Sequence, residues 1–202
     1  MAPNLLGIRI AHRAMRADTR RLAVLMNEIA AGELLPDAVR LRAIGGFATR
    51  LCATIKHHHE TEDDVLWPII VRSAGAAADL SDLTEDHEAL DPLLDEVVQN
   101  VAAPARMAKA LARLADLLDE HIEEEERLIF PLITRYVSDA DWKTVEDAAR
   151  KGSKLSFELP RIAQYARPDE MDALREEAGP LMVALLALFN RGHRRRQRLI
   201  FA

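Results

Sequence analysis

Four stretches of this chain carry a helical stripe of apolar residues, and in each stretch the stripe is interrupted by a histidine. The apolar residues recur at steps of three and four, which is the spacing of the buried face of a helix in a bundle. His12, His58, His87 and His121 each occupy a stripe position where an aliphatic residue is expected. The pattern therefore predicts four helices that direct imidazoles into a shared core.

The second and fourth stretches repeat one another. HHHETEDDVLWPII, residues 57–70, and HIEEEERLIFPLI, residues 121–133, each place a Glu four residues after the stripe His and a Pro six residues after that Glu. The offset is 63 residues for three pairs: His58 and His121, Glu62 and Glu125, and Pro68 and Pro131. Because positions i and i+4 lie on one helix face, each His and Glu pair is expected to point at the same part of the core.

The stripes also give expectations for the residues after each His and Glu pair. The second stripe is expected to continue through Val65 and the fourth through Leu128. Since proline lacks a backbone N–H and clashes with the preceding turn, Pro68 and Pro131 are each expected to end or kink their helix.

Burying these polar groups requires partners, because an unpaired carboxylate or imidazole in an apolar core is costly. Metal ions would satisfy all six groups. Four imidazoles and two carboxylates suit iron, manganese, cobalt or zinc, while the single Cys52 excludes a thiolate site. Six ligands are too many for one tetrahedral zinc, so we infer a binuclear site with shared carboxylates.

The length and composition fit an all-α fold. The chain has 202 residues with 49% hydrophobic residues, 8 Gly and 9 Pro, and it is rich in helix formers. Short connections between long helices favour an antiparallel up-down-up-down four-helix bundle. We expect this bundle to span residues 1–138, followed by a helical C-terminal extension over residues 139–202.

The same features give expectations about location. A lone cysteine and an N-terminus without a signal-peptide pattern predict a cytoplasmic protein. The longest apolar run, residues 181–189, is too short to span a membrane. A net charge of −6 argues against nucleic-acid binding, although five Arg lie between Arg191 and Arg198.

The C-terminal extension contains no further pair with ligand spacing. Residues 139–152 are expected to form a short helix, and a second helix is expected to begin at Pro168 and to be interrupted at Gly179 and Pro180. These helices are expected to pack on the bundle or to mediate self-association as a homo-oligomer, in preference to lying on an anionic membrane surface. His193 stands among arginines and is left out of the metal site.

With the residues arranged in this way, the chain resembles the hemerythrin-like proteins, the His-His-Glu cation-binding family, over about residues 1–138. The resemblance implies a four-helix bundle around a non-haem di-iron centre. It implies that His12, His58, His87 and His121 are terminal ligands. Glu62 and Glu125 would bridge two iron ions together with an oxo, hydroxo or water species. Ligand chemistry alone leaves manganese and zinc open.

Two departures from the oxygen-carrying hemerythrins concern the ligand set. Those proteins have a His where this chain has Leu83, and they have Asp five residues after the last His where this chain has Glu125 at four. His59 is the candidate for the missing ligand, and His57 is expected to be a solvated or supporting neighbour. The remaining acidic residues of both motifs are expected to form solvated helix faces: Glu60, Asp63, Asp64, Glu123, Glu124 and Glu126.

Two functions from different classes remain open. The first is a non-haem di-iron protein that binds or reacts with dioxygen, hydrogen peroxide or nitric oxide, for sensing, detoxification or storage. The alternative is a metal-dependent regulatory or interaction module without turnover. A ferritin-like oxidase is disfavoured because its ligation is dominated by carboxylates.

Overall fold

The computed structural model describes residues 3–75 and 78–202, apart from the side chains of residues 177, 178 and 182. Within these residues every regular element is a helix, as the composition predicts, and there is no strand. The elements are α1 (Leu6–Ala31), α2 (Ala38–Thr61), the π-helix η1 (Glu62–Leu66), α3 (Trp67–Ala74), α4 (Ser81–Gln99), α5 (Pro104–Tyr136), α6 (Asp139–Gly152), α7 (Leu155–Tyr165) and α8 (Pro168–Phe201).

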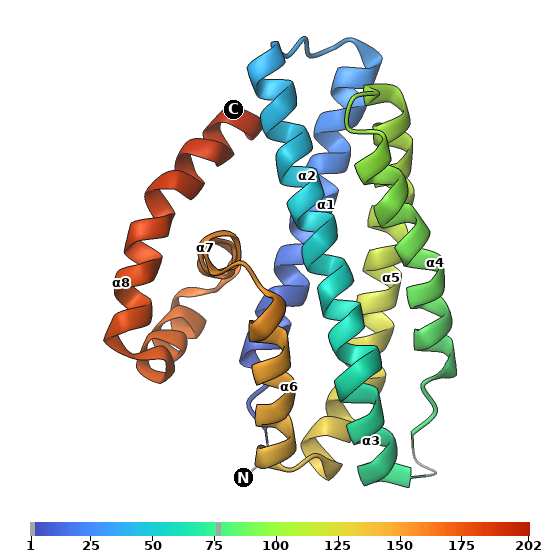
Figure 1. The fold of residues 1–202 in the computed structure, drawn as a ribbon, viewed down its shortest axis with the longest axis vertical. Coiled ribbons are helices and arrows are strands. Elements are labelled where there is room, and N and C mark those ends of the chain that lie inside the picture. The colour runs from blue at the N-terminus through green and yellow to red at the C-terminus, as the bar shows by residue number, and fades with distance from the viewer. Residues whose placement is uncertain (1–2, 76–77) are drawn as a thin grey trace.

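Four long helices form the body of the molecule. α1, α2, α4 and α5 lie side by side along its long axis (Figure 1). α5 packs against α1 and α4, and α2 packs against α4 and α1. The four stretches with interrupted stripes are therefore neighbours in space.

Local sequence signals set the helix ends. Gly32 ends α1 with a φ of 77°, a left-handed conformation that glycine adopts without steric cost. The Asp37 side chain accepts a hydrogen bond from the backbone N–H of Arg40 and thereby caps α2. Pro104 begins α5, where a missing N–H removes no hydrogen bond. The predicted helix over residues 139–152 is confirmed as α6, capped by Ser138.

The sequence predicts that Pro68 ends or kinks its helix, and the first of these two alternatives is wrong. The helical path continues from α2 through η1 and α3 to Ala74. Immediately before Pro68 the turn widens, and the backbone N–H of Trp67 bonds to the carbonyl of Glu62, five residues back. The wide turn accommodates a residue that cannot donate to the preceding turn, so the helical path can continue past Pro68.

Pro131 does not end α5 either, because the helix continues to Tyr136. Beyond the two glutamates the predicted stripes are only partly correct, since Ile69 is buried as expected but Val65 and Leu128 are not the most buried positions. Leu66 and Ile129 are fully buried, whereas Val65 and Leu128, each one residue earlier, are only partly buried. An α-helix has 3.6 residues per turn, so the next buried position after Glu125 is four residues later, at Ile129, and not three residues later.

The buried polar residues divide the hydrophobic core into two clusters. One cluster includes Met15, Leu51 and Leu118. The other cluster includes Leu66 and Ile129, which follow the His and Glu pairs in the sequence. A polar layer thus crosses the molecule between two apolar ones. Cys52 is buried in the first cluster, and burial raises the pKa of its thiol to about 12, as expected for a structural cysteine.

The C-terminal helices pack on the four long ones. α6 lies against α2 and η1, α7 against α1, and α8 against α7 and α2. A buried ion pair anchors α7, with Arg161 Nε donating to Asp18 Oδ2 at 2.6 Å. The predicted interruption of the last helix is confirmed at Gly179, whose φ is 72°. Among the described residues no helix is both long and apolar enough to cross a membrane.

Candidate metal centre

The structure brings all seven predicted site residues together as two groups. His12, His58, Glu62 and Glu125 form one group, and His59, His87 and His121 form the other. Within each group one ligand atom from every residue lies within 4.8 Å of the others. The residues come from α1, α2, η1, α4 and α5, so each of the four helices that lie side by side contributes.

The two glutamates each reach both groups. Glu62 Oε1 lies 3.1 Å from His58 Nε2, and its Oε2 lies 3.6 Å from His87 Nε2. Glu125 Oε2 lies 3.5 Å from His12 Nε2 and 4.0 Å from His121 Nε2. Both carboxylates therefore stand between the groups, which is where a shared ligand of two ions would have to stand.

His59 lies fully inside the second group. Its side chain is 2% exposed, and its ring stacks on that of His87 with the centroids 4.2 Å apart. His58 faces the first group and is more exposed, at 17%. Successive helical residues point about 100° apart, so two adjacent histidines can serve two groups that flank the helix. Leu83 stays in the second hydrophobic cluster and away from the polar layer.

Acidic side chains hold the outer nitrogens of the histidines. His12 Nδ1 lies 3.0 Å from Glu126 Oε1, and His87 Nδ1 lies 3.0 Å from Asp63 Oδ1. The prediction that Glu126 and Asp63 belong to solvated faces is therefore wrong for these two residues. Each directly follows one of the central glutamates, so the repeat at an offset of 63 residues contains the acidic pair as well and could have identified them.

Two further acidic residues were missed by the sequence reasoning. Asp86 Oδ2 lies 3.2 Å from His121 Nδ1. Asp91 Oδ1 lies 3.7 Å from His59 Nδ1, which is too long for a hydrogen bond. Such carboxylates orient an imidazole and raise its basicity toward a metal. No periodic signal distinguishes them, because both lie off the apolar stripe.

The other candidates lie outside the two groups. His57 Nε2 contacts the carbonyl oxygen of Ala149 on α6 at 3.0 Å, which agrees with a supporting role. His193 is buried and bonds to Gln164. Glu60, Asp64 and Glu123 are exposed, as predicted for solvated faces.

The inner atoms of the site lack partners. Both oxygens of Glu62 and of Glu125 and both ring nitrogens of His59 are buried without a hydrogen bond. Buried polar groups are almost always satisfied in folded proteins. Here three neighbouring residues have no hydrogen bond on any polar side-chain atom. A bound cation would satisfy these atoms. The donor set of imidazoles and carboxylates fits a metal ion of borderline character.

Burial also sets the charge of the site. Burial, reinforced by the neighbouring histidines, lowers the pKa of His58 and of His59 well below the usual range. Burial thus favours the neutral form of these two imidazoles, which has an electron pair to donate. Burial and the adjacent Glu125 raise the pKa of Glu62 well above its usual range. A cation would offset the charge that burial disfavours.

Helical architecture and a buried set of imidazoles and carboxylates together define a helical metal-binding protein. Its family is shown by the sequence: the model of the hemerythrin HHE cation-binding domain matches residues 7–133, and the chain belongs to this family. The match ends before α6, so the last three helices lie outside it. Neither the curated proteins nor the solved structures contain a significant match to the chain.

Proposed function

We propose that this protein holds two iron ions in the polar layer and uses them to bind or reduce a small oxidant, namely dioxygen, hydrogen peroxide or nitric oxide. The observation that carries the proposal is the position of Glu62 and Glu125. Each carboxylate reaches histidines of both groups, and neither has a hydrogen-bond partner. Two shared carboxylates between two sets of imidazoles favour a pair of ions over a single one.

The proposed ligand sets correspond to the two groups. His12 and His58 would hold one ion, and His59, His87 and His121 would hold the other. Glu62 and Glu125 would bridge the pair, with an oxo, hydroxo or water species completing the bridge. Under this proposal α1, α2, α4 and α5 form an antiparallel four-helix bundle over residues 1–138, and residues 139–202 form an extension that packs on it. Iron is the first choice because of the family, while manganese and zinc suit the same donors.

The chain's own residues prepare the site for this chemistry. When bound, a reduced pair of iron ions can supply two electrons to one oxidant molecule. Phe130 stacks on the ring of His12, and Trp67 stacks on the ring of His87, so aromatic side chains shield the imidazoles from water. Glu126, Asp63 and Asp86 keep three imidazoles oriented through their Nδ1 atoms.

Metal analysis combined with optical spectra tests the proposal. About two irons per chain are expected, with a charge-transfer band that changes when oxygen, peroxide or nitric oxide is added to the reduced protein. A protein that holds only zinc and shows no spectral response to any of the three would refute it.

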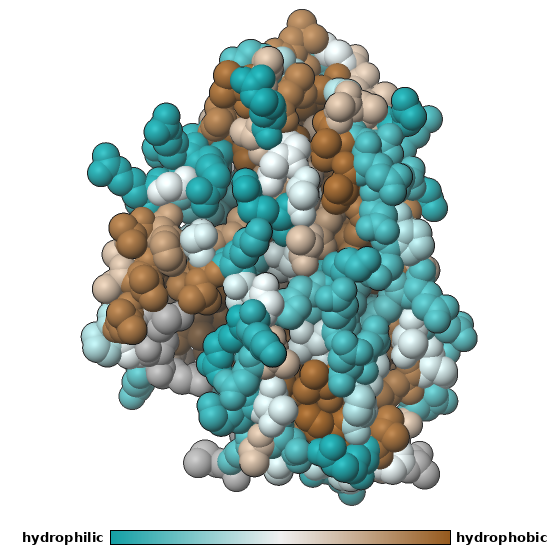
Figure 2. Space-filling view, viewed as in Figure 1, coloured by the Kyte–Doolittle hydropathy of each residue, from teal (hydrophilic) through white to brown (hydrophobic). Residues whose placement is uncertain are grey.

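A second candidate function has its own support. His57 precedes the ligand His58 and contacts α6, so the metal site is in direct contact with the C-terminal helices. α8 exposes the apolar side chains of Leu181, Val183 and Leu188. Figure 2 shows apolar surface in the region of this helix. A regulatory module would change its oligomeric state or partner binding when metal is removed, with little turnover. Sedimentation of the metal-loaded and metal-free chain distinguishes the two functions.

A further inference from the structure

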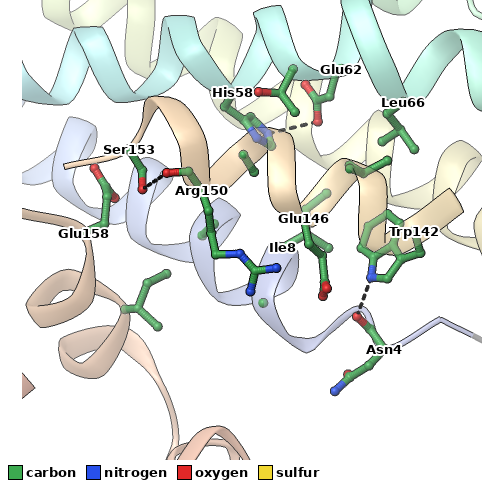
Figure 3. Close-up of a pocket in the computed structure, with 16 residues that line it drawn as sticks. Asn4, Ile8, His58, Glu62, Leu66, Trp142, Glu146, Arg150, Ser153 and Glu158 are labelled. Atoms are coloured by element: carbon green, nitrogen blue, oxygen red, sulfur yellow. Dashed lines mark hydrogen bonds and ion pairs between the residues drawn. The ribbon is translucent and has the colours of Figure 1, made fainter. Parts of the chain in front are cut away.

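A cleft of about 320 Å³ opens beside the metal-site residues. It lies between α1, α2 with η1, α6 and the start of α7 (Figure 3). His58 and Glu62 form one wall, and Trp142 and Arg150 of α6 lie along another. The cleft thus connects the solvent to two of the proposed ligands.

The size of the cleft exceeds what a two-atom oxidant needs. A water molecule takes up about 30 Å³ in the liquid, so dioxygen, peroxide or nitric oxide would leave most of the space empty. Sites that bind small organic molecules start at about 300 Å³. The volume therefore fits an organic molecule with a body the size of a benzene ring or larger.

Small and apolar side chains shape this space. Gly7 and Ala11 occupy one face of α1, and a Cβ atom added at Gly7 would meet no atom within 4 Å. Ile8, Leu66 and Val145 supply apolar surface. The indole N–H of Trp142 already donates to the backbone carbonyl of Asn4 at 3.1 Å (Figure 3), so its ring offers the cleft only apolar contact.

The polar groups of the proposed metal site, Glu62 and His58, lie at one end of the cleft only. Glu62 is 2% exposed, and neither of its oxygens accepts a hydrogen bond. The charged groups elsewhere in the lining are already paired. Arg150 bonds to Asp147 at 2.6 Å, and Glu158 bonds to Arg161 at 2.9 Å. An apolar body with one uncharged oxygen-bearing head group matches this distribution, because a charged ligand would have to break an existing pair.

We propose that the cleft between α1, η1 and α6 binds a neutral organic molecule, with its apolar body against Ile8, Leu66 and Trp142 and its hydroxyl-type head group toward Glu62 and His58. Much of the binding wall then comes from α6, which lies outside the matched family domain of residues 7–133. The C-terminal extension would in this way determine which molecules reach the metal centre.

Binding of 2-phenylethanol to the purified full-length chain tests this inference. The probe combines one aromatic ring with one hydroxyl group. Calorimetry should show saturable binding, and quenching of Trp142 fluorescence excited at the red edge should follow the same curve. Trp142→Phe should remove that part of the signal, since Trp67, the other of the two tryptophans, does not line the cleft.

Variants that fill the cleft provide the decisive comparison. Gly7→Leu and Ala11→Leu should each weaken binding by about tenfold or more, because their side chains would occupy the apolar part of the cleft. Leu also favours a helix more than Gly does, so loss of binding in Gly7→Leu would not reflect unfolding. Gly7→Ala, and Ala30→Leu at an exposed position of α1, serve as matched controls and should bind as the unchanged protein does.

The absence of saturable binding, or binding that both filled variants retain, would overturn the inference. The proposed metal function would stand in either case, because it depends on metal content and spectra. Conversely, a protein that binds 2-phenylethanol but no iron would keep the cleft and lose the proposed function.

Discussion

Glu62→Gln should stabilise the metal-free protein and weaken metal binding at the same time. The structure gives Glu62 no hydrogen-bond partner, and its pKa is raised by burial and by Glu125. When folding raises the pKa of a carboxyl, its protonated form stabilises the fold. This contribution to the free energy of unfolding is complete below the pKa of the unfolded chain, 4.5, and is lost as the pH rises toward the folded-state pKa. At pH 7 the unchanged protein therefore carries a penalty that a neutral amide avoids.

The size of the effect has an upper bound. Keeping a carboxyl neutral at pH 7 against an unfolded pKa of 4.5 costs at most about 3 kcal/mol, since one pH unit corresponds to about 1.4 kcal/mol. Gln remains a buried polar group without partners, so we expect a gain of about 1–3 kcal/mol. For a chain of this length each kcal/mol raises the melting temperature by about 2–4 °C.

Thermal unfolding of both proteins after chelation measures this gain. The difference between them should be largest near pH 7 and should vanish near pH 4, where Glu62 is protonated in both states. Adding iron should reverse the order, because metal binding stabilises only the protein that keeps its ligand. The matched control is Glu124→Gln, a partly exposed glutamate paired with Arg127, which should change stability by less than about 0.5 kcal/mol. A metal-free Glu62→Gln protein that is less stable at pH 7, or one that still binds two irons, would refute the reasoning.

Three other changes have defined outcomes. His59→Ala should lower the metal content from about two ions per chain toward one, whereas His57→Ala should leave it unchanged; equal metal content in both variants would exclude His59 as a ligand. Glu126→Gln removes the acceptor at His12 Nδ1 and should weaken metal affinity about 10–100-fold in a chelator competition, and unchanged affinity would show that this contact does not tune the site. Asp18→Ala leaves the buried Arg161 without its 2.6 Å partner and should cost about 3–5 kcal/mol in denaturant unfolding, while a loss below about 1 kcal/mol would contradict the buried ion pair.

Periodicity in the sequence predicted the helical class correctly and selected candidate site residues that the structure brings together. The all-helical fold and the family are confirmed, and the seven candidate ligands lie together in two groups. The polar residues were identifiable because a His or Glu on an apolar stripe is costly unless something satisfies it. The prolines misled the prediction, since a π turn before Pro68 allows the helix to continue, and such a turn depends on backbone hydrogen bonds that residue types do not reveal.

The sequence by itself indicated which face of each helix turns toward the core, because the 3.6-residue period assigns each residue to a helix face. It could not assign Glu126 and Asp63 to His12 and His87, since these contacts cross between helices and depend on how the helices pack. Only the tertiary structure decided that His58 and His59 face different groups and that Glu62 and Glu125 stand between them. The same packing placed α6 over the exposed side of His58 and formed the cleft. Helix faces are set by local geometry, whereas the partners across them depend on the position of every helix at once.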